Sequence, residues 1–332
     1  EHLSDGRAAG VVVVSKNANV ANGPDGTADA HAVLAAVAAR LGSEPTDLLI
    51  ASTGVIGRRY PIDRMLDRIR TMPTQLVDID LAPAAAGIMT TDTVAKTARA
   101  EIAGCAGSVV GIAKGVGMIE PDMATMIAIV LTDAAVASDE LDRVFRRVVD
   151  RTLNCVSIDT DTSTSDTAVV MASGSAGPVD LAAFEEALFE VCVDLTKQIA
   201  RDGEGAQTLL EVAVTGARDD AQAKRVAKAI VNSPLVKTAV HGADPNWGRV
   251  AMAIGKCSDD TDIDQDRVVI RFGETEVYPG QVDAAGLATL SIYMRGDTVS
   301  IGADLGIADG TATVWGCDLT DGYVRINADY TT

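Results

Sequence analysis

Short runs of consecutive apolar residues recur along this chain, bounded by Gly, Asp, Asn and Pro, which is typical of buried strands. Up to residue 215 they predict strands at 11–14, 48–52, 108–113, 126–132, 168–171 and 209–215. Beyond residue 232 the pattern is mostly strand-like, and it predicts strands at 249–254, 267–272, 297–303, 311–316 and 322–328.

Other segments place apolar residues three and four positions apart, which predicts amphipathic helices. These helices cover 28–41, 61–72, 138–154, 181–199 and 219–232. Pro61 suits a first helical turn, Ser138 is a candidate N-cap, and Gly203 is expected to cap the helix before it. Strands and helices follow one another in mixed order, without an internal repeat or a linker. The pattern therefore predicts an α+β, layered architecture.

Composition narrows the class of protein. With 332 residues, 47% of them hydrophobic but only 3% aromatic, the core is built mainly from Ala, Val, Leu and Ile. Lys and Arg number 28 against 47 Asp and Glu, a net charge of −19 that repels nucleic acids and anionic membranes. No apolar run approaches the ~20 residues of a membrane span. We therefore expect neither nucleic-acid nor membrane binding.

The cysteines indicate a cellular compartment, and the first residues of the chain indicate whether a segment precedes them. Five scattered cysteines without a C-x-x-C pair favour reduced thiols of the cytoplasm over a disulfide framework or a zinc site. The chain begins at Glu1 rather than Met and enters a predicted strand at Val11. We expect that an N-terminal segment precedes it in the whole protein.

One stretch organises the candidate chemistry: Lys114-Gly-Val-Gly-Met-Ile-Glu-Pro-Asp-Met-Ala124-Thr125, followed at once by a predicted strand. Cleavage between Ala124 and Thr125 would give Thr125 a free α-amine, whose usual pKa is about 7.7–8.0. Such an amine beside the threonine hydroxyl is an activated nucleophile. The alternative is an ordinary loop that leads into a strand.

Two further stretches carry candidate site residues. Thr53 and Gly54 follow a predicted strand, and a hydroxyl beside a glycine amide can form an oxyanion hole, although a strand-ending turn is the alternative. Glu204 lies between Gly203 and Gly205 after a predicted helix. Its carboxylate could orient an ammonium group or move a proton, and the alternative is a glycine cap with a solvated glutamate.

A polar loop is predicted at His241-Gly-Ala-Asp-Pro-Asn-Trp-Gly-Arg249, either lining a site or forming a hydrogen-bonded turn. Two acidic runs, starting at Asp159 and Asp260, lack the Gly and Glu of a calcium-binding loop, so we reject both as calcium sites. Phosphate-loop, esterase and zinc-protease signatures are absent from the sequence.

Taken together, these motifs resemble one family, the ornithine acetyltransferases or glutamate N-acetyltransferases. The resemblance covers essentially the whole chain. Its motifs, in order, are Ser52-Thr-Gly-Val-Ile-Gly57, Lys114-Gly-Val-Gly-Met with Pro121-Asp-Met-Ala-Thr125-Met, Asp159-Thr-Asp-Thr-Ser-Thr-Ser-Asp-Thr167, Asp202-Gly-Glu-Gly-Ala206, Asp244-Pro-Asn-Trp-Gly-Arg249 and Asn327-Ala-Asp-Tyr-Thr-Thr332. Several stretches, such as Val240 to Arg249, are especially similar to the family's paralogue in the clavulanic acid cluster.

The resemblance implies a layered α/β sandwich of the DmpA/ArgJ-like type, akin to N-terminal-nucleophile enzymes. It implies autocatalytic cleavage between Ala124 and Thr125 into an α chain, 1–124, and a β chain, 125–332, intertwined in one αβ unit. Such units associate further, into a heterotetramer. The implied reaction moves an acetyl group from N2-acetyl-ornithine to glutamate through an acetyl-Thr125 intermediate, with ornithine released and no cofactor or metal.

The resemblance also implies a role for each matching residue. Thr125 is the nucleophile and Thr53 with Gly54 the oxyanion hole, while Glu204 acts near the leaving or attacking amine. The implied substrate contacts are Thr91, Lys114, Thr125, Glu204, Asn327 and Thr332. Lys114 can pair with the substrate α-carboxylate, and Asn327 and Thr332 can hold its side chain.

One departure from the family pattern concerns the pathway. Where arginine-pathway members read Asn-Ala-Cys-Thr-Gly, this chain reads Asn19-Val-Ala-Asn-Gly23. The product could therefore serve arginine or a secondary metabolite. Two other functions stay open on the sequence: an amidase that gives the acyl group to water, and a silent paralogue that only binds an amino acid.

Overall fold

Three sheets carry the fold of the computed structural model, which describes residues 2–75, 80–120 and 126–329. The predicted site residues Ala124, Thr125 and Thr332 lie outside these ranges. The first sheet is a parallel pair, β1 (Gly10–Val14) and β2 (Leu48–Ser52), in which Val14 lies opposite Ser52. Both strands form where the sequence has its uninterrupted apolar runs, as predicted.

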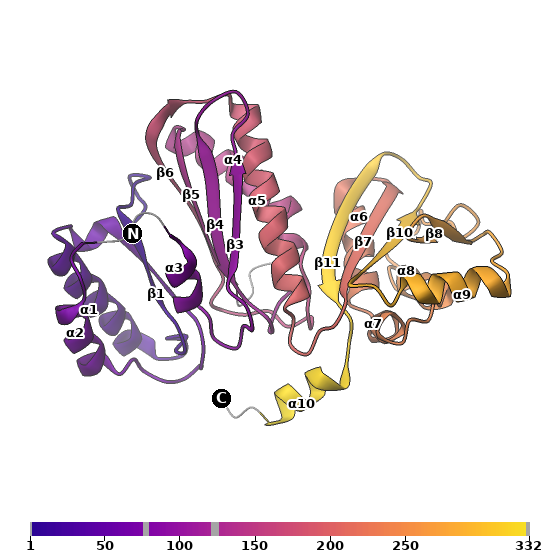
Figure 1. Ribbon diagram of the computed structural model, residues 1–332, viewed down its shortest axis with the longest axis horizontal. Helices are drawn as coiled ribbons and strands as arrows, with labels where there is room; N and C mark the ends of the chain where they lie inside the picture. The colour runs from indigo at the N-terminus through magenta and orange to yellow at the C-terminus, as the bar shows by residue number, and fades with distance from the viewer. Residues whose placement is uncertain (1, 76–79, 121–125, 330–332) are drawn as a thin grey trace.

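The second sheet has the order β3-β4-β5-β6 and lies in the middle of the molecule (Figure 1). Neighbouring strands are antiparallel except β5 and β6, which run parallel. Its strands are β3 (Lys96–Glu101), β4 (Ser108–Lys114), β5 (Ile127–Ala135) and β6 (Thr167–Pro178). The first two strands of the fold pack on β4 and β5 through a small apolar cluster that includes Ala51, Ile112 and Ile127.

The third sheet has the order β11-β7-β10-β8-β9 and stands at the other side of the molecule (Figure 1). Its central strands β7 and β10 are parallel, and the outer pairs are antiparallel. The strands are β7 (Leu209–Ala217), β8 (Val269–Phe272), β9 (Thr275–Tyr278), β10 (Thr298–Asp304) and β11 (Gly310–Cys317).

Helices cover each sheet. α1 (Gly23–Leu41) and α2 (Ile62–Thr71) pack together beside the first sheet, and α3 (Ala82–Gly87) lies against β3 and β4. α5 (Leu181–Arg201) covers β3 and β4 of the second sheet, and α4 (Ser138–Arg151) packs beside α5. α10 (Asp321–Asp329) ends the described chain. The third sheet carries α6 (Asp220–Val231), α7 (Pro234–His241), α8 (Trp247–Gly255) and α9 (Ala284–Tyr293). Single 3₁₀ turns form at η1 (Pro45–Asp47) and η2 (Leu153–Cys155).

The largest apolar core runs along α5. Its predicted face is buried except for the partly buried Leu181, and Phe184, Leu188 and Leu195 are at 0% exposure. Gly111 of β4 lets the helix approach closely, since a Cβ there would come within 2.8 Å of Leu195 Cδ1. The small-residue composition of the chain therefore serves close packing of helix on sheet.

Two predicted strands are wrong, because the chain is helical at both places. The run 249–254 belongs to α8, where Val250, Ala253 and Ile254 are buried at helical spacing and face α6. A short apolar run fits either period, and here the tertiary contacts select the helix. The run 322–328 belongs to α10, which buries none of its residues. Its β-branched residues suggested a strand, but the segment pairs with no sheet within the described chain.

Two predicted caps differ as well. Ser138 is the first residue of α4, with Ala137 as its N-cap, and the Ser138 hydroxyl donates to the Gly6 carbonyl instead. α5 ends at Arg201 with Asp202 as its cap, so Gly203 adopts no left-handed cap conformation. The left-handed glycine of this turn is Gly205, with φ +72°. The reason for that conformation lies in the candidate site.

Candidate active site

Glu204 joins three segments that are far apart in the sequence. The Thr91 hydroxyl donates to Glu204 Oε1 at 3.3 Å, and Asn327 Nδ2 donates to Oε2 at 2.9 Å. The sequence separations are 113 and 123 residues. Thr91 follows α3, Glu204 follows α5, and Asn327 belongs to α10. Three of the residues predicted from sequence are thus brought together around one carboxyl group.

The loop after β4 wraps around Glu204. The Glu204 N–H donates to the Val116 carbonyl at 2.8 Å. Gly117 has no room for a side chain, because a Cβ there would come within 2.8 Å of the Glu204 carboxyl carbon. The glycines of the 114–118 stretch therefore allow its backbone to pass directly over the carboxylate, and Lys114 is held at the start of that loop.

Gly205 brings α10 to the site. A Cβ on Gly205 would lie 2.3 Å from the Tyr323 nitrogen, and the Thr320 hydroxyl donates to the Gly205 carbonyl at 2.7 Å. The close approach and the positive φ both require glycine here. Asn327 can reach Glu204 because the first turn of α10 rests on this glycine.

We predict that Gly205→Ala weakens both folding and activity. Left-handed backbone costs a residue with a Cβ about 1–2 kcal/mol, and the overlap with Tyr323 adds to that cost by displacing α10. The measurements are the free energy of unfolding in urea and kcat/KM for the acetyl transfer that the resemblance implies. Gly42→Ala is the matched control, because Gly42 has φ +74° but a Cβ added there would meet nothing within 4 Å. It should lose only the backbone part of the stability and keep its activity; equal activity losses in both variants would contradict the prediction.

Thr53, Gly54 and Lys114 form a second group. Lys114 Nζ donates to the Thr53 hydroxyl oxygen at 3.3 Å, and both side chains are buried. The Thr53 N–H donates to the Val14 carbonyl, so the donor that Thr53 can offer a ligand is its hydroxyl. Gly54 has φ +129°, and a Cβ there would meet the Lys16 backbone at 2.3 Å. All three residues were predicted from the sequence as site residues, but the contact between Lys114 and Thr53 was not.

A buried charge network supports both groups, and the sequence pattern did not reveal it. Lys96 Nζ lies 2.8 Å from Asp92 Oδ1 and 2.5 Å from Asp202 Oδ2, with the lysine side chain at 0% exposure. Asp92 also accepts from the Gly115 N–H at 2.7 Å and lies 3.9 Å from Lys114 Nζ. Asp92 adjoins Thr91, and Asp202 precedes Glu204 by two residues. One lysine therefore connects the backbone segments that carry Thr91, Lys114 and Glu204.

Charge and burial shift the pKa values of this network in opposite ways. Burial alone would raise the pKa of Asp92, but Lys114, Lys96 and the Gly115 N–H outweigh it and hold that pKa below its usual value. Burial lowers the pKa of Lys114, against the opposing charges of Asp92, Asp166 and Glu204. Because Glu204 acts on Lys114 by its charge, the two groups form one electrostatic unit.

Asp166 is a second residue that the motifs did not single out. It precedes β6, and its Oδ1 accepts from the Met126 N–H at 2.7 Å. Its Oδ2 is buried and has no hydrogen-bond partner among the described residues. Burial raises the pKa of Asp166 to about 7, although the Met126 N–H and Lys114 oppose the rise. The only feature of the sequence that could have identified Asp166 is its position in the polar motif from Asp159 to Thr167.

The polar loop predicted at 241–249 lies elsewhere in the described structure and is partly helical. His241 ends α7 and its ring nitrogen Nδ1 pairs with Asp318 Oδ2 at 3.0 Å. Trp247 begins α8 and stacks on Tyr278 with 4.9 Å between the ring centroids. Asn246 Nδ2 donates to Asp244 Oδ2, a contact between two side chains, whereas the predicted turn had these side chains bonded to the backbone.

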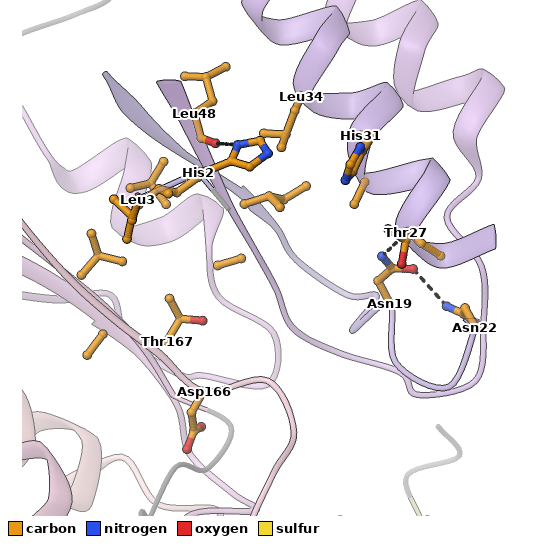
Figure 2. Close-up of a pocket in the computed structure, with 18 of the residues that line it drawn as sticks. His2, Leu3, Asn19, Asn22, Thr27, His31, Leu34, Leu48, Asp166 and Thr167 are labelled. Atoms are coloured by element: carbon orange, nitrogen blue, oxygen red, sulfur yellow. Dashed lines mark hydrogen bonds between the residues drawn. The ribbon is translucent and has the colours of Figure 1, made fainter. Parts of the chain in front are cut away.

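A cavity of about 790 Å³ lies between the first sheet with α1 and the start of β6. Figure 2 shows Asp166 at one end and His2, Leu34 and Leu48 toward the other. Thr53, Lys114 and Glu204 do not line it. The cavity is therefore separate from the groups described above, apart from Asp166 at its end.

Metal ligation and membrane insertion find no support in the described part of the chain. Within 2–75, 80–120 and 126–329, no group of three His, Cys, Asp or Glu side chains is arranged to hold a metal ion. No described helix has the length and apolar content to cross a membrane.

Known proteins match the chain over its whole length. The family model of the ArgJ family matches residues 1–332. The glutamate N-acetyltransferase Oat2 of Streptomyces clavuligerus is 60% identical over 337 residues, covering 100% of this chain and 85% of that protein. The arginine biosynthesis bifunctional protein ArgJ 2 of Nostoc is 56% identical over 332 residues, with the same two coverages.

A solved structure agrees with these matches. The crystal structure of the arginine biosynthesis bifunctional protein argJ from Bacillus halodurans is 43% identical, with a TM-score of 0.56. It covers 60% of this chain and 96% of that one. The fold agrees with this structure, the family model matches all 332 residues, and relatives are up to 60% identical. The chain therefore belongs to the ArgJ family.

Proposed function

We propose that this protein is a glutamate N-acetyltransferase that moves the acetyl group of N2-acetyl-ornithine to glutamate. The observation that carries the proposal is the convergence on Glu204 of Thr91 and Asn327, from segments more than 100 residues away. A carboxylate that two neutral donors hold, and whose charge acts on a buried lysine, suits a substrate with both amine and carboxylate groups. Relatives at 60% and 56% identity are named for this activity or for arginine biosynthesis.

The reaction starts, in this proposal, with cleavage between Ala124 and Thr125. The resulting chains, 1–124 and 125–332, would stay together because β4 and β5 are paired along their length. Lys114, before the cut, lies opposite Ile127, after it. Six such pairs from Val109 to Lys114 hold the two strands side by side. The pairing supports an αβ unit that survives its own processing, and the resemblance implies that such units assemble into a heterotetramer.

Acyl transfer then proceeds in two balanced steps. The Thr125 hydroxyl oxygen attacks the acetyl carbonyl carbon while the α-amine of Thr125 takes the hydroxyl proton. The tetrahedral intermediate collapses, the C–N bond to ornithine breaks, and the departing nitrogen receives that proton. In the second step the neutral amine of glutamate attacks the acetyl ester carbon, the C–O bond to Thr125 breaks, and the proton that the attacking nitrogen loses passes through the α-amine to the Thr125 oxygen.

The described residues supply the surroundings of these steps. Lys114 donates to the Thr53 oxygen, which leaves the Thr53 hydroxyl hydrogen free to point at the developing oxyanion together with the Gly54 N–H. Glu204 can receive the ammonium of ornithine or glutamate, with Thr91 and Asn327 fixing both carboxylate oxygens. Lys114 and the end of the chain, Thr332, are the proposed contacts to the rest of the substrate.

A denaturing mass spectrum of the purified protein tests this function directly. We expect two chains that divide between Ala124 and Thr125, and a mass gain of one acetyl group on the 125–332 chain after N2-acetyl-ornithine is added. Glutamate should then remove that group and appear as N-acetylglutamate. A single uncut chain, or acetyl release to water at the same rate without glutamate, would overturn the proposed transferase.

A further inference from the structure

The buried carboxylate of Asp92 is surrounded by three hydrogen-bond donors and a second cation. Its side chain is 0% exposed. Oδ1 accepts from Lys96 Nζ at 2.8 Å and from the Gly115 N–H at 2.7 Å. Oδ2 accepts from the Thr90 N–H at 3.0 Å and lies 3.9 Å from Lys114 Nζ. The carboxylate therefore holds Lys114 at two points, the backbone directly after it and the ammonium group.

Lys114 needs an anionic partner because its side chain is only 3% exposed. Burial lowers the pKa of its ammonium group, and Asp92 opposes that fall. Lys96 adds to the fall, whereas Asp166 and Glu204 oppose it by their charge. Among the residues that the structure describes, Asp92 is the one carboxylate that forms an ion pair with Lys114. The charge of Lys114 in its buried position therefore depends first on Asp92.

The charge on Lys114 decides what the Thr53 hydroxyl can do. Lys114 Nζ lies 3.3 Å from the Thr53 hydroxyl oxygen. An ammonium group has three donors and no acceptor, so the Thr53 oxygen must accept from it and the Thr53 hydroxyl hydrogen points elsewhere. A neutral amine has a lone pair that can accept that hydrogen instead. Loss of the charge would turn the Thr53 hydroxyl toward the lysine and away from a ligand.

We propose that Asp92 is a positioning residue for Lys114: it keeps the lysine in its ammonium form and holds it on Thr53, so that the Thr53 hydroxyl can donate to the reacting carbonyl oxygen. The inference rests on the proposed function, in which Thr53 belongs to the oxyanion hole. Lys96 and the Gly115 N–H occupy Oδ1, so that Oδ2 faces Lys114. Asp92 belongs to none of the motifs that carry the family resemblance.

Asp92→Asn is the variant that tests this role. Asparagine has nearly the same shape and keeps an oxygen for the Gly115 N–H, but it carries no charge. The matched control is Asp202→Asn, which removes the other buried carboxylate on Lys96 and forms no ion pair with Lys114 in the described structure. The measurement is the titration of the Lys114 ε-carbon in enzyme that contains ¹³C-labelled lysine. The signal is assigned by its absence from Lys114→Arg.

We expect the titration midpoint of Lys114 to fall by about one pH unit or more in Asp92→Asn, because an opposite charge at this distance shifts a pKa by about 1–3 units. The direction is downward, since a negative charge favours the protonated form of a neighbouring amine. Asp202→Asn should move the midpoint by less than half as much.

The pH profile of acetyl transfer should follow the same titration. The basic limb of kcat/KM reports an essential acid of the free enzyme, so it should move down in Asp92→Asn by the same amount as the Lys114 midpoint. The substrate amines titrate identically in every variant, so a difference between the profiles comes from the protein. Above the variant's midpoint kcat should fall about tenfold or more, with the ~10²–10³-fold loss for one oxyanion donor as the upper bound. Below that midpoint the variant should approach the wild type.

Each outcome has a separate meaning. A wild type that transfers no acetyl group to glutamate overturns the proposed function, and the carbon titration still measures the pair of Asp92 and Lys114. A midpoint that Asp92→Asn moves no further than Asp202→Asn overturns the inference alone. A lower midpoint with an unmoved basic limb and an activity loss that is the same at every pH also overturns it, because the charge on Lys114 then does not control the reaction.

A second measurement needs no variant at Asp92. The ¹⁵N shift of the Lys114 side chain in the wild type distinguishes an ammonium group from a neutral amine. We expect an ammonium at about pH 8, where a free α-amine is at least half unprotonated. A neutral Lys114 at that pH overturns the inference even if Asp92→Asn does not fold.

Discussion

Thr125→Ala should give a single uncut chain without acetyltransferase activity. Alanine lacks the oxygen that attacks the preceding peptide bond and later carries the acetyl group. Loss of a catalytic serine nucleophile costs about 10⁶-fold in kcat in a serine protease, so any remaining transfer should be below detection. Denaturing mass spectrometry and an assay for N-acetylglutamate are the two measurements. Thr125→Ser keeps a hydroxyl and should still be cut and acetylated.

The control for this prediction is Thr311→Ala, an exposed threonine at the start of β11. It should be cut and active like the wild type. Thermal unfolding should show that Thr125→Ala is folded, so that its inactivity is not a folding defect. A Thr125→Ala variant that still splits between residues 124 and 125, or still transfers acetyl groups, would remove Thr125 from the mechanism.

Lys96→Met should cause the largest loss of stability. The methionine fills the same space but leaves the Asp202 carboxylate, which is 4% exposed, without its cation, and leaves Asp92, which is 0% exposed, with only Lys114 at 3.9 Å. Removing one partner of a buried ion pair costs about 3–5 kcal/mol. Urea unfolding should report this loss, and activity should fall with it because the network holds the segments that carry Thr91, Lys114 and Glu204.

The loss should depend on pH in a defined direction. In the wild type Lys96 is one of the groups that hold the folded pKa of Asp92 below its usual value, so this contribution to stability is present above the unfolded pKa of about 3.9 and is lost as pH falls below it. The gap between the variant and the wild type should therefore be smaller at about pH 3 than at about pH 7. The double variant Lys96→Met with Asp202→Asn removes one of the two charges and should recover part of the loss.

An exposed ion pair provides the comparison. Arg143→Met breaks the pair of Arg143 with Asp139, whose side chains are 64% and 80% exposed. Exposed pairs contribute about 0–1 kcal/mol, so this variant should unfold almost like the wild type. A Lys96→Met loss below about 1 kcal/mol, or one that does not change with pH, would show that the buried network contributes little.

Local pattern predicted much of the fold. The face of α5 is buried as its apolar spacing indicates, and β1, β2 and β4 form where the apolar runs are. The spacing of apolar residues within one short segment is enough to predict which face of a strand or helix is buried. These elements can therefore be predicted from the sequence. The runs at 249–254 and 322–328 fit a strand equally well. Packing of α8 against α6 selects the helix in the first run, and in the second the described chain offers α10 no sheet to pair with.

The chemistry divides in the same way. The sequence identified Thr53, Gly54, Lys114 and Glu204 as candidate site residues because each is a glycine or lies beside one at the end of a predicted strand or helix. Lys96 and Asp166 gave no comparable local sign. Lys96 acts on Asp202 from 106 residues away, and Asp166 acts on Met126 from 40.

The sequence alone predicts the helices and strands that have a regular spacing of apolar residues. It also determines the negative net charge and identifies Thr125 as the candidate nucleophile. The folded chain had to place Thr91 and Asn327 on Glu204, Lys114 on Thr53 and Lys96 between two carboxylates. The physical reason is that periodic burial is a property of neighbouring residues. A hydrogen bond between residues 100 positions apart exists only where packed sheets and helices bring the two backbones together.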